Sequence, residues 1–248
     1  MKIILCDKKA VDVKQSYGEI TGLLDEDSRA GIERYRFEEG RLTAFVRELA
    51  LRYVFFETFG EGEIRISENE FGKPFVLKPG KEGTEFCRKD GEDFEFNISH
   101  AGDLVCIIYG QERAGIDVEK DSRVKDTDLL NRFLYEHERA RVEIAEDKQK
   151  EFCRIWTFRE ALCKEEGLGL SLFEREGEDK EELIRIDYEK NRVDLKGRRL
   201  FFYEYPCPGY HLTCCLGKKD KRPELIWTDM QMWEEMKNVF SRIRISRI

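Results

Sequence analysis

Two long segments of this chain carry apolar residues at helical spacing, and short segments with strand patterning surround each of them. The first helical pattern covers residues 41–59 and the second covers residues 147–166. The neighbouring segments alternate between apolar and polar residues, or form short apolar runs between turn residues. Because each half of the chain mixes one or two helices with several strands, the sequence predicts an α+β fold made of two α/β halves.

The two halves are expected to meet in the short polar segment 110–115, which ends in a glycine. This boundary gives an N-terminal half of residues 1–112 and a C-terminal half of residues 113–248, with a tail from about residue 222. Trp, Met and Phe recur at helical spacing between residues 227 and 243, which favours a helix packed on the protein's own core over a helix that binds a partner.

The remaining segments are assigned by alternation, charge and turn residues. A third helical pattern covers 126–140, a turn over 70–76 leads into a strand, and charged surface loops are expected at 78–93 and 174–182. Other strands are expected at 2–6, 64–67, 94–98, 104–109, 116–119, 183–188, 192–195, 200–205 and 211–216.

The composition argues against several classes of protein. The net charge is −8, whereas nucleic-acid binders usually carry the opposite balance. No apolar run approaches the ~18 residues that a membrane span needs, and the segment 1–6 lacks the layout of a signal peptide. We therefore expect a cytoplasmic protein that binds neither nucleic acid nor membrane.

Eight cysteines occur in the chain, and none of them form a C-x-x-C pair. Structural zinc usually needs paired ligands at short spacing, and only three histidines are present to help. Three of the cysteines lie inside apolar runs, namely Cys106, Cys214 and Cys215. The pattern favours buried, reduced thiols over a metal site.

The segment 115–120 places two carboxylates at alternate positions of a predicted strand. Alternate side chains of a strand point to the same face, so Asp117 and Glu119 share one face while Ile116 and Val118 enter the core. Their Cα atoms would lie about 6.6 Å apart, close enough for both carboxylates to reach one ion. The alternative is an ordinary amphipathic edge strand with its polar face in water.

The helical pattern 147–166 adds a carboxylate and an ammonium group at one edge of its apolar face. Glu160 and Lys164 are one turn apart beside an arc that includes Phe152, Ile155 and Leu162. One interpretation is a surface ion pair worth ~0.3–0.5 kcal/mol. The other is a third carboxylate together with a phosphate-binding ammonium.

Three converging carboxylates would repel one another unless a cation neutralised them. Mg²⁺ typically uses one or two protein carboxylates, several waters and phosphate oxygens of the substrate. Because three candidates exceed this number, we expect Glu160, which comes from a different element, to act through water or as a general base. These residues predict metal-assisted phosphoryl-type transfer.

Five motifs, taken in order over about residues 30–220, closely resemble the 4′-phosphopantetheinyl transferases, in particular the surfactin-synthetase-activating branch, in which two similar halves are fused in one chain. No single motif is decisive, since Lys73 alone indicates an exposed turn cation and His100 alone a turn or core histidine. The motifs are Phe71-Gly-Lys-Pro74, Phe96-Asn-Ile-Ser-His100, Gly115-Ile-Asp-Val-Glu-Lys120, Asn131-Arg-Phe-Leu-Tyr135, and Trp156-x-x-Arg-Glu-Ala161 with Lys164 and Gly167-x-Gly-Leu170.

The resemblance implies a fold of two halves related by a pseudo-twofold arrangement, and it implies a reaction. Such enzymes move the phosphopantetheine arm of coenzyme A onto a serine of an apo acyl or peptidyl carrier protein and release 3′,5′-ADP, in fatty-acid, polyketide or nonribosomal peptide biosynthesis. Mg²⁺ would bridge the pyrophosphate to the carboxylates matching Asp117, Glu119 and Glu160. The single-chain form implies a monomer.

The resemblance also assigns roles to individual residues. Glu160 matches the base that deprotonates the serine, and Lys164 matches a lysine that contacts the phosphates near the reacting bond. Lys73 and His100, with Ser99 beside it, match residues at the 3′-phosphoadenosine end of coenzyme A. An arginine early in the first long helix commonly helps there, and the candidate is Arg41.

The chain departs from the family pattern at Arg159, where lysine is usual. This arginine falls within the apolar arc of the helix, which predicts an internal ion pair. Segment 20–40, where basic contacts to coenzyme A are often found, is only loosely similar. Two other functions compete with the transferase: a catalytically silent module that binds coenzyme A or a carrier protein, and an unrelated Mg²⁺-dependent phosphohydrolase.

Overall fold

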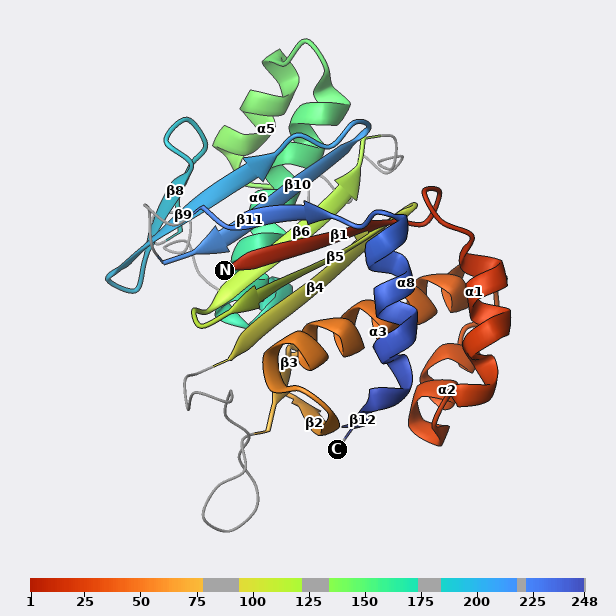
Figure 1. Ribbon diagram of the computed structural model, residues 1–248. Helices are drawn as coiled ribbons and strands as arrows, with labels where there is room; N and C mark the ends of the chain where they lie inside the picture. The colour runs from red at the N-terminus through yellow and green to blue at the C-terminus, as the bar shows by residue number, and fades with distance from the viewer. Residues whose placement is uncertain (78–93, 122–133, 174–183, 218–221, 248) are drawn as a thin grey trace. The chain divides into compact units, whose positions relative to one another are not determined.

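The structure, a computed structural model, describes residues 1–77, 94–121, 134–173, 184–217 and 222–247 (Figure 1). The chain divides into two compact units, and each has its own core. Unit 1 consists of Met1–Glu112 and Pro223–Ile248, and unit 2 consists of Arg113–Arg222. Helices and strands are mixed in both units, which confirms the predicted α+β class. The two expected charged loops lie outside the described residues.

The main sheet of unit 1 has four strands in the order β11-β1-β5-β4. Strand β1 pairs antiparallel with β5 and parallel with β11. Continuous apolar runs occupy the two central strands, as expected for strands that are covered on both faces. The strand bounds are β1 Lys2–Asp7, β4 Glu95–Ala101, β5 Leu104–Gly110 and β11 Glu224–Trp227.

A smaller sheet of unit 1 has three strands in the order β12-β2-β3. The central strand β2 pairs parallel with β12 and antiparallel with β3. A turn over residues 69–73 joins β2 to β3, so the expected turn is present, but residues 74–76 of the segment assigned to it already form β3. The strand bounds are β2 Gly62–Glu68, β3 Pro74–Val76 and β12 Ile243–Arg247.

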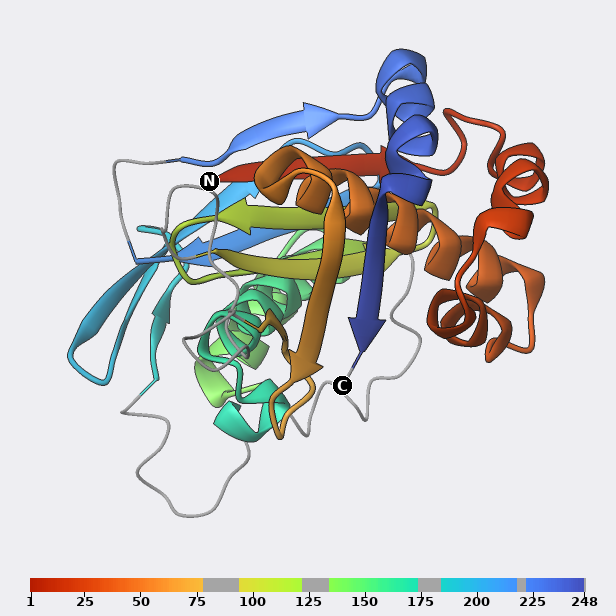
Figure 2. The same cartoon turned by 60° about the horizontal axis from the view of Figure 1, so that its bottom comes forward.

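The helices of unit 1 gather around the long helix α3 on one side of the main sheet (Figures 1 and 2). Aspartate side chains cap three of them: Asp12, Asp25 and Asp229 each accept a hydrogen bond from a backbone N–H of the first turn. The helix predicted at 41–59 is confirmed as α3. The bounds are α1 Val13–Ile20, η1 Thr21–Leu23, α2 Glu26–Glu33, α3 Glu38–Phe59, α8 Met230–Val239 and η3 Phe240–Arg242.

The C-terminal tail, which we expected in the C-terminal half, belongs to unit 1. One helix was predicted over 227–243, but the segment contains the end of β11, then α8 and η3, and the start of β12. The prediction that this helix packs on the protein's own core is confirmed, because Trp233 and Met236 are fully buried. The Trp233 indole N–H donates a 2.9 Å hydrogen bond to the Ser16 hydroxyl of α1.

Unit 2 has a five-stranded antiparallel sheet in the order β6-β10-β9-β8-β7, with α6 packed against β6 and β10 and α5 against α6. The predicted helix 147–166 is confirmed as α6. Of the helical pattern 126–140, the part before residue 134 lies outside the described residues. The bounds are α5 Glu136–Ile144, α6 Lys148–Glu166, η2 Gly169–Phe173, β6 Ala114–Lys120, β7 Ile186–Asp187, β8 Arg192–Leu195, β9 Arg198–Tyr205 and β10 Tyr210–Leu216.

Seven of the eight cysteines lie in described segments, and all seven are buried, as predicted. Burial raises the pKa of Cys6 to about 11, that of Cys153 to about 11 and that of Cys214 to about 12.

Thiols of this kind are expected to resist alkylation in the folded protein, because the thiolate is the reactive form. We expect iodoacetamide at pH 7.5 to leave all seven unmodified in the native protein and to modify them in guanidinium chloride, as measured by peptide mass mapping. Rapid labelling of Cys6 or Cys214 in the native protein would contradict this burial.

In the described part of the chain, no helix combines the length and the apolar composition needed to cross a membrane.

Candidate functional site

The edge strand β6 carries the two carboxylates that the sequence places at alternate positions. Gly115, Asp117 and Glu119 point to one face of the strand, and α6 covers that face. Asp117 is therefore 3% exposed, and Glu119 is partly buried. The alternative of an amphipathic strand with its polar face in water is wrong for Asp117, because a helix lies over the polar face.

Gly115 sets how closely α6 approaches β6. A Cβ atom at this position would lie 2.0 Å from the carbonyl oxygen of Ala161 and 2.4 Å from the backbone nitrogen of Glu165. Only a residue without a side chain allows the helix backbone to lie this close to the strand. The glycine thus brings the turn of α6 that contains residues 160–164 next to Asp117.

The ammonium group of Lys164 forms an ion pair with this strand carboxylate. Its Nζ lies 2.6 Å from Oδ1 of Asp117, and the Lys164 side chain is 26% exposed. An ion pair between a buried carboxylate and a half-buried lysine on another element is stronger than an exposed i,i+4 pair. The interpretation of Lys164 as part of a simple surface pair is therefore wrong.

Glu160 lies in the same electrostatic environment, one turn before Lys164 on α6. Burial raises the pKa of Glu160 above its ordinary value; the Lys164 ammonium opposes this shift, and the Asp117 carboxylate adds to it. The neighbouring Arg159 also opposes it. Unit 2 therefore brings together Asp117, Glu160 and Lys164, with Glu119 two positions further along the same strand face.

The donor atoms of this site suit a hard cation. Within the described ranges, no group of three or more His, Cys, Asp or Glu side chains has the geometry of a complete metal cage. Mg²⁺ does not require one, because it typically takes one or two protein carboxylates and completes its shell with water and phosphate oxygens. Asp117, Glu119 and Glu160 are all oxygen donors, so their chemistry fits Mg²⁺.

The candidate lysine of unit 1, Lys73, lies in the tight turn between β2 and β3. The Asn69 side-chain oxygen accepts hydrogen bonds from the backbone N–H groups of Phe71 (3.0 Å) and Lys73 (2.8 Å). Gly72 has a φ of +81°, a conformation that favours glycine. The Phe-Gly-Lys-Pro motif is therefore a defined turn that holds Lys73 at the tip of the hairpin.

Ser99 and His100 are consecutive residues of β4, which continues to Ala101. The strand expected at 94–98 therefore extends three residues further than predicted, and the turn before β5 starts at Gly102. Consecutive strand residues point to opposite faces, so Ser99 is buried while His100 is exposed. The two residues are adjacent along the chain, but their side chains do not share a surface.

Arg41 lies in the first turn of α3. Its Nη1 donates to the carbonyl oxygens of Tyr35 (3.1 Å) and Arg36 (3.0 Å), which ties the preceding loop to the helix. The Tyr35 hydroxyl in turn accepts a 3.2 Å hydrogen bond from Arg34, and this bond, helped by Arg47, lowers the pKa of Tyr35. Arg41 was the only arginine of this region predicted as a site residue, although arginine recurs through residues 29–47 of the sequence.

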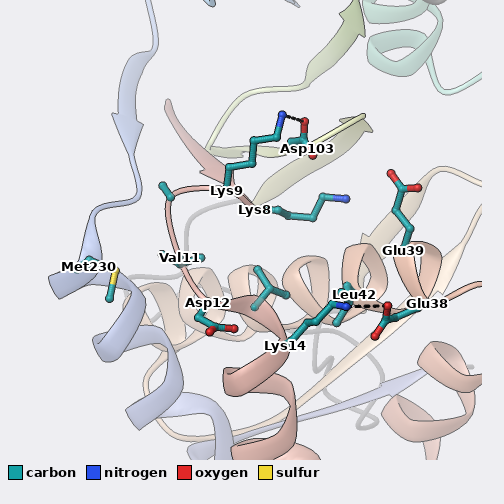
Figure 3. Close-up of a pocket in the computed structure, with 12 residues that line it drawn as sticks. Lys8, Lys9, Val11, Asp12, Lys14, Glu38, Glu39, Leu42, Asp103 and Met230 are labelled. Carbon is teal, nitrogen blue, oxygen red and sulfur yellow. Dashed lines mark hydrogen bonds and ion pairs between the residues drawn. The ribbon is translucent and has the colours of Figure 1, made fainter.

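A cavity of about 670 Å³ lies near the start of α3 (Figure 3). Three lysines line it, and each has a partner: Lys8 donates to Thr43 (2.8 Å), Lys9 pairs with Asp103 (2.6 Å), and Lys14 pairs with Glu38 (2.9 Å). None of the site residues predicted from the sequence line this cavity. Lys9 and Lys14 are paired with carboxylates, whereas Lys8 bonds to a neutral hydroxyl. Because none of the predicted site residues lines the cavity, it is not the candidate site.

Two family models match the chain, one for each unit. The model described as the 4′-phosphopantetheinyl transferase superfamily matches residues 113–215, and the model described as the N-terminal part of 4′-phosphopantetheinyl transferase matches residues 12–112. The two matches are consecutive and meet at the boundary between residues 112 and 113. The residues after 215, including β11, α8 and β12, lie outside both.

Several curated proteins are similar over part or most of the chain. The 4′-phosphopantetheinyl transferase Sfp of Bacillus subtilis (strain 168) is 28% identical over 154 residues, which are 60% of this chain and 62% of Sfp. A phosphopantetheinyl transferase of Thraustochytrium is 28% identical over 59% of this chain and 54% of its own length. The 4′-phosphopantetheinyl transferase ffp of Bacillus subtilis is 25% identical over 81% of this chain and 85% of its own length. The match thus spans less than two thirds of the first two relatives.

Proposed function

The chain belongs to the 4′-phosphopantetheinyl transferase superfamily, and from this membership we propose that it transfers the 4′-phosphopantetheine group of coenzyme A to a serine of an apo carrier protein. The observation that carries the proposal is the ion pair between Asp117 and Lys164 beside the partly buried Glu160. It combines a phosphate-binding cation with carboxylates that suit a metal ion. This combination lies in the unit that matches the superfamily model.

The proposed reaction is a displacement at phosphorus. The serine oxygen of the carrier bonds to the phosphorus that bears the pantetheine arm, the bond from this phosphorus to the bridging pyrophosphate oxygen breaks, and 3′,5′-ADP leaves. Glu160 takes the serine proton, directly or through a water molecule, and its raised pKa suits a base near neutral pH. The nucleophile is supplied by the partner, so this chain needs no activated serine or cysteine.

Charge neutralisation at the pyrophosphate is assigned to Lys164 and the carboxylate group. Lys164 would contact a phosphate oxygen, with Asp117 holding the lysine in place until substrate binds. Mg²⁺ would be held by Asp117, Glu119 and Glu160, and when bound it supplies positive charge to the pyrophosphate oxygens. Glu160 would therefore have two roles, as a metal ligand and as a base.

The 3′-phosphoadenosine end of coenzyme A is assigned to unit 1. His100 is exposed on β4, and Lys73 is held at the tip of the β2–β3 hairpin, so both suit contact with a phosphate or a base. Arg41 would hold the loop before α3 in a conformation that receives the nucleotide. Ser99 is buried and would support β4 rather than contact the ligand.

We propose a cytoplasmic monomer with coenzyme A and a carrier protein as its partners. Buried, reduced thiols are typical of proteins from reducing compartments, which supports the cytoplasm; five thiols carry this argument, namely Cys6, Cys153, Cys163, Cys214 and Cys215. One chain carries both units, so a single copy would hold all the assigned residues.

The proposal is tested by intact-mass measurement of several apo carrier proteins incubated with this protein, coenzyme A and Mg²⁺. We expect at least one carrier to gain the mass of phosphopantetheine, and EDTA to abolish this gain because the carboxylates then lack their cation. Binding of coenzyme A with no mass gain on any carrier would favour the silent binding module. Breakdown of coenzyme A without a carrier would favour a phosphohydrolase.

A further inference from the structure

A fully buried arginine directly precedes Glu160 on α6. Arg159 is 0% exposed, and its Nη1 donates to Oε2 of Glu138 at 2.5 Å. Its guanidinium carbon lies 3.8 Å from the ring centroid of Phe173 and 4.7 Å from that of Tyr135. The internal ion pair predicted from the sequence is therefore present, and aromatic rings enclose it.

The partner carboxylate is itself held by several hydrogen bonds. Glu138 Oε1 accepts a 2.5 Å hydrogen bond from the Tyr188 hydroxyl, and Oε2 accepts a 2.8 Å hydrogen bond from the backbone N–H of Tyr135. These contacts join the start of α5 and the segment before β8 to Arg159. A side chain held from three elements fixes the rotation of its helix turn more tightly than apolar packing alone.

The pairing with Glu138 uses only part of the hydrogen-bonding capacity of Arg159. Its Nε and Nη2 are buried, and neither has a hydrogen-bond partner among the residues that the structure describes. The guanidinium also interacts favourably with the next carboxylate along the helix, that of Glu160. A fully buried cation therefore immediately precedes Glu160 on α6.

We propose that Arg159 is a positioning residue for Glu160. Its contacts with Glu138, Tyr135 and Phe173 fix the helix turn that presents Glu160 beside Asp117 and Lys164. The inference rests on the proposed transferase function, and it extends that function from the reacting groups to the buried pair behind them.

The experiment has to separate positioning from folding. Arg159→Met alone would leave the Glu138 carboxylate buried without its cation and would strongly destabilise the fold. The double variant Glu138→Met/Arg159→Met removes both charges at similar volume, and such replacements usually preserve stability. Arg159→Lys is the conservative variant, because it keeps a charge that can pair with Glu138.

We expect the double variant to fold, as judged by circular dichroism and a cooperative melt, but to lose ~10²-fold in kcat with little change in KM for coenzyme A. Binding of Mn²⁺, measured by electron paramagnetic resonance without coenzyme A, should weaken ~10-fold or more. Arg159→Lys should recover most of both quantities. If the Met pair does not fold, Glu138→Gln/Arg159→Gln replaces it, since the two amides can bond to each other.

A folded double variant with the parental kcat and Mn²⁺ affinity would overturn the proposal and leave the pair a structural role only. So would Arg159→Lys losing as much activity as the double variant. If the proposed transferase function is wrong, the parent protein itself will modify no carrier. The Mn²⁺ affinities of parent and variants still test the positioning role of Arg159 in that case.

Discussion

Glu160→Gln is expected to abolish phosphopantetheine transfer while making the folded protein more stable without metal. Loss of the base and of one metal ligand should lower kcat by ~10³-fold or more. Burial raises the pKa of Glu160, so ionisation of this carboxyl destabilises the fold, and the free energy of unfolding falls as the pH rises through that pKa. Glutamine does not ionise and lacks this penalty at pH 7.

The measurement combines carrier-modification rates with thermal melts in EDTA at pH 7 and at pH 4. The melting temperature of Glu160→Gln should exceed that of the parent at pH 7, and the difference should shrink at pH 4, where the parent carboxyl is protonated. Glu143→Gln, which changes an exposed glutamate of α5 paired with Lys148, is the matched control and should leave both quantities nearly unchanged. Retained transfer in Glu160→Gln would contradict the assigned role.

Gly115→Ala is expected to destabilise unit 2 by at least about 3 kcal/mol, although it adds only one methyl group. The new Cβ would overlap the Ala161 carbonyl oxygen and the Glu165 backbone nitrogen, and neither can move unless the whole helix does. Any variant that folds should separate α6 from β6 and weaken the ion pair between Lys164 and Asp117. We expect chemical denaturation to show lower stability and mass spectrometry to show little transfer.

The matched control is Gly31→Ala in α2. Its Cβ would meet nothing within 4 Å, and the glycine has ordinary helical geometry. Alanine should therefore stabilise this helix by about 0.5–1 kcal/mol. Equal stability changes in Gly115→Ala and Gly31→Ala would mean that the contact between α6 and β6 is looser than described.

The elements that the sequence predicted best are those with long, regular patterns. Helices α3 and α6 were found to within a few residues, because a helix of about twenty residues repeats its apolar period several times. Strand β8 was found with its observed bounds, 192–195, between clear turn residues. The short helices α1 and α2 were missed, since eight residues carry too few apolar positions to show a period.

The tail shows why some features could not be predicted. Pairing of β11 with β1 and of β12 with β2 joins segments more than 180 residues apart, and no local pattern encodes such a contact. The apolar residues from 227 to 243 fit one helical period, although strands occupy both ends of the segment. Local periodicity therefore identified what is buried but not what it is buried against.

The candidate site was predicted in its residue types but not in its pairings. Spacing placed Asp117 and Glu119 on one strand face and Glu160 and Lys164 on one helix face, which is the local part of the geometry. The close contact between α6 and β6 requires glycine at position 115, because a Cβ atom there would overlap the helix backbone. This requirement is visible only once the helix is packed on the strand. Lys164 therefore bonds across to Asp117, a partner that helix spacing alone does not reveal.

The return of the tail to unit 1 has a consequence for how the protein is made. Unit 2 is complete once Arg222 has left the ribosome, whereas unit 1 still lacks β11, α8 and β12 at that stage. The hydrogen bond from the Arg52 guanidinium of α3 to the carbonyl oxygen of Phe240 can form only after a further 188 residues have been synthesised. We therefore expect unit 2 to fold first during synthesis, with the earlier-made unit 1 kept open to chaperones until the last residues emerge.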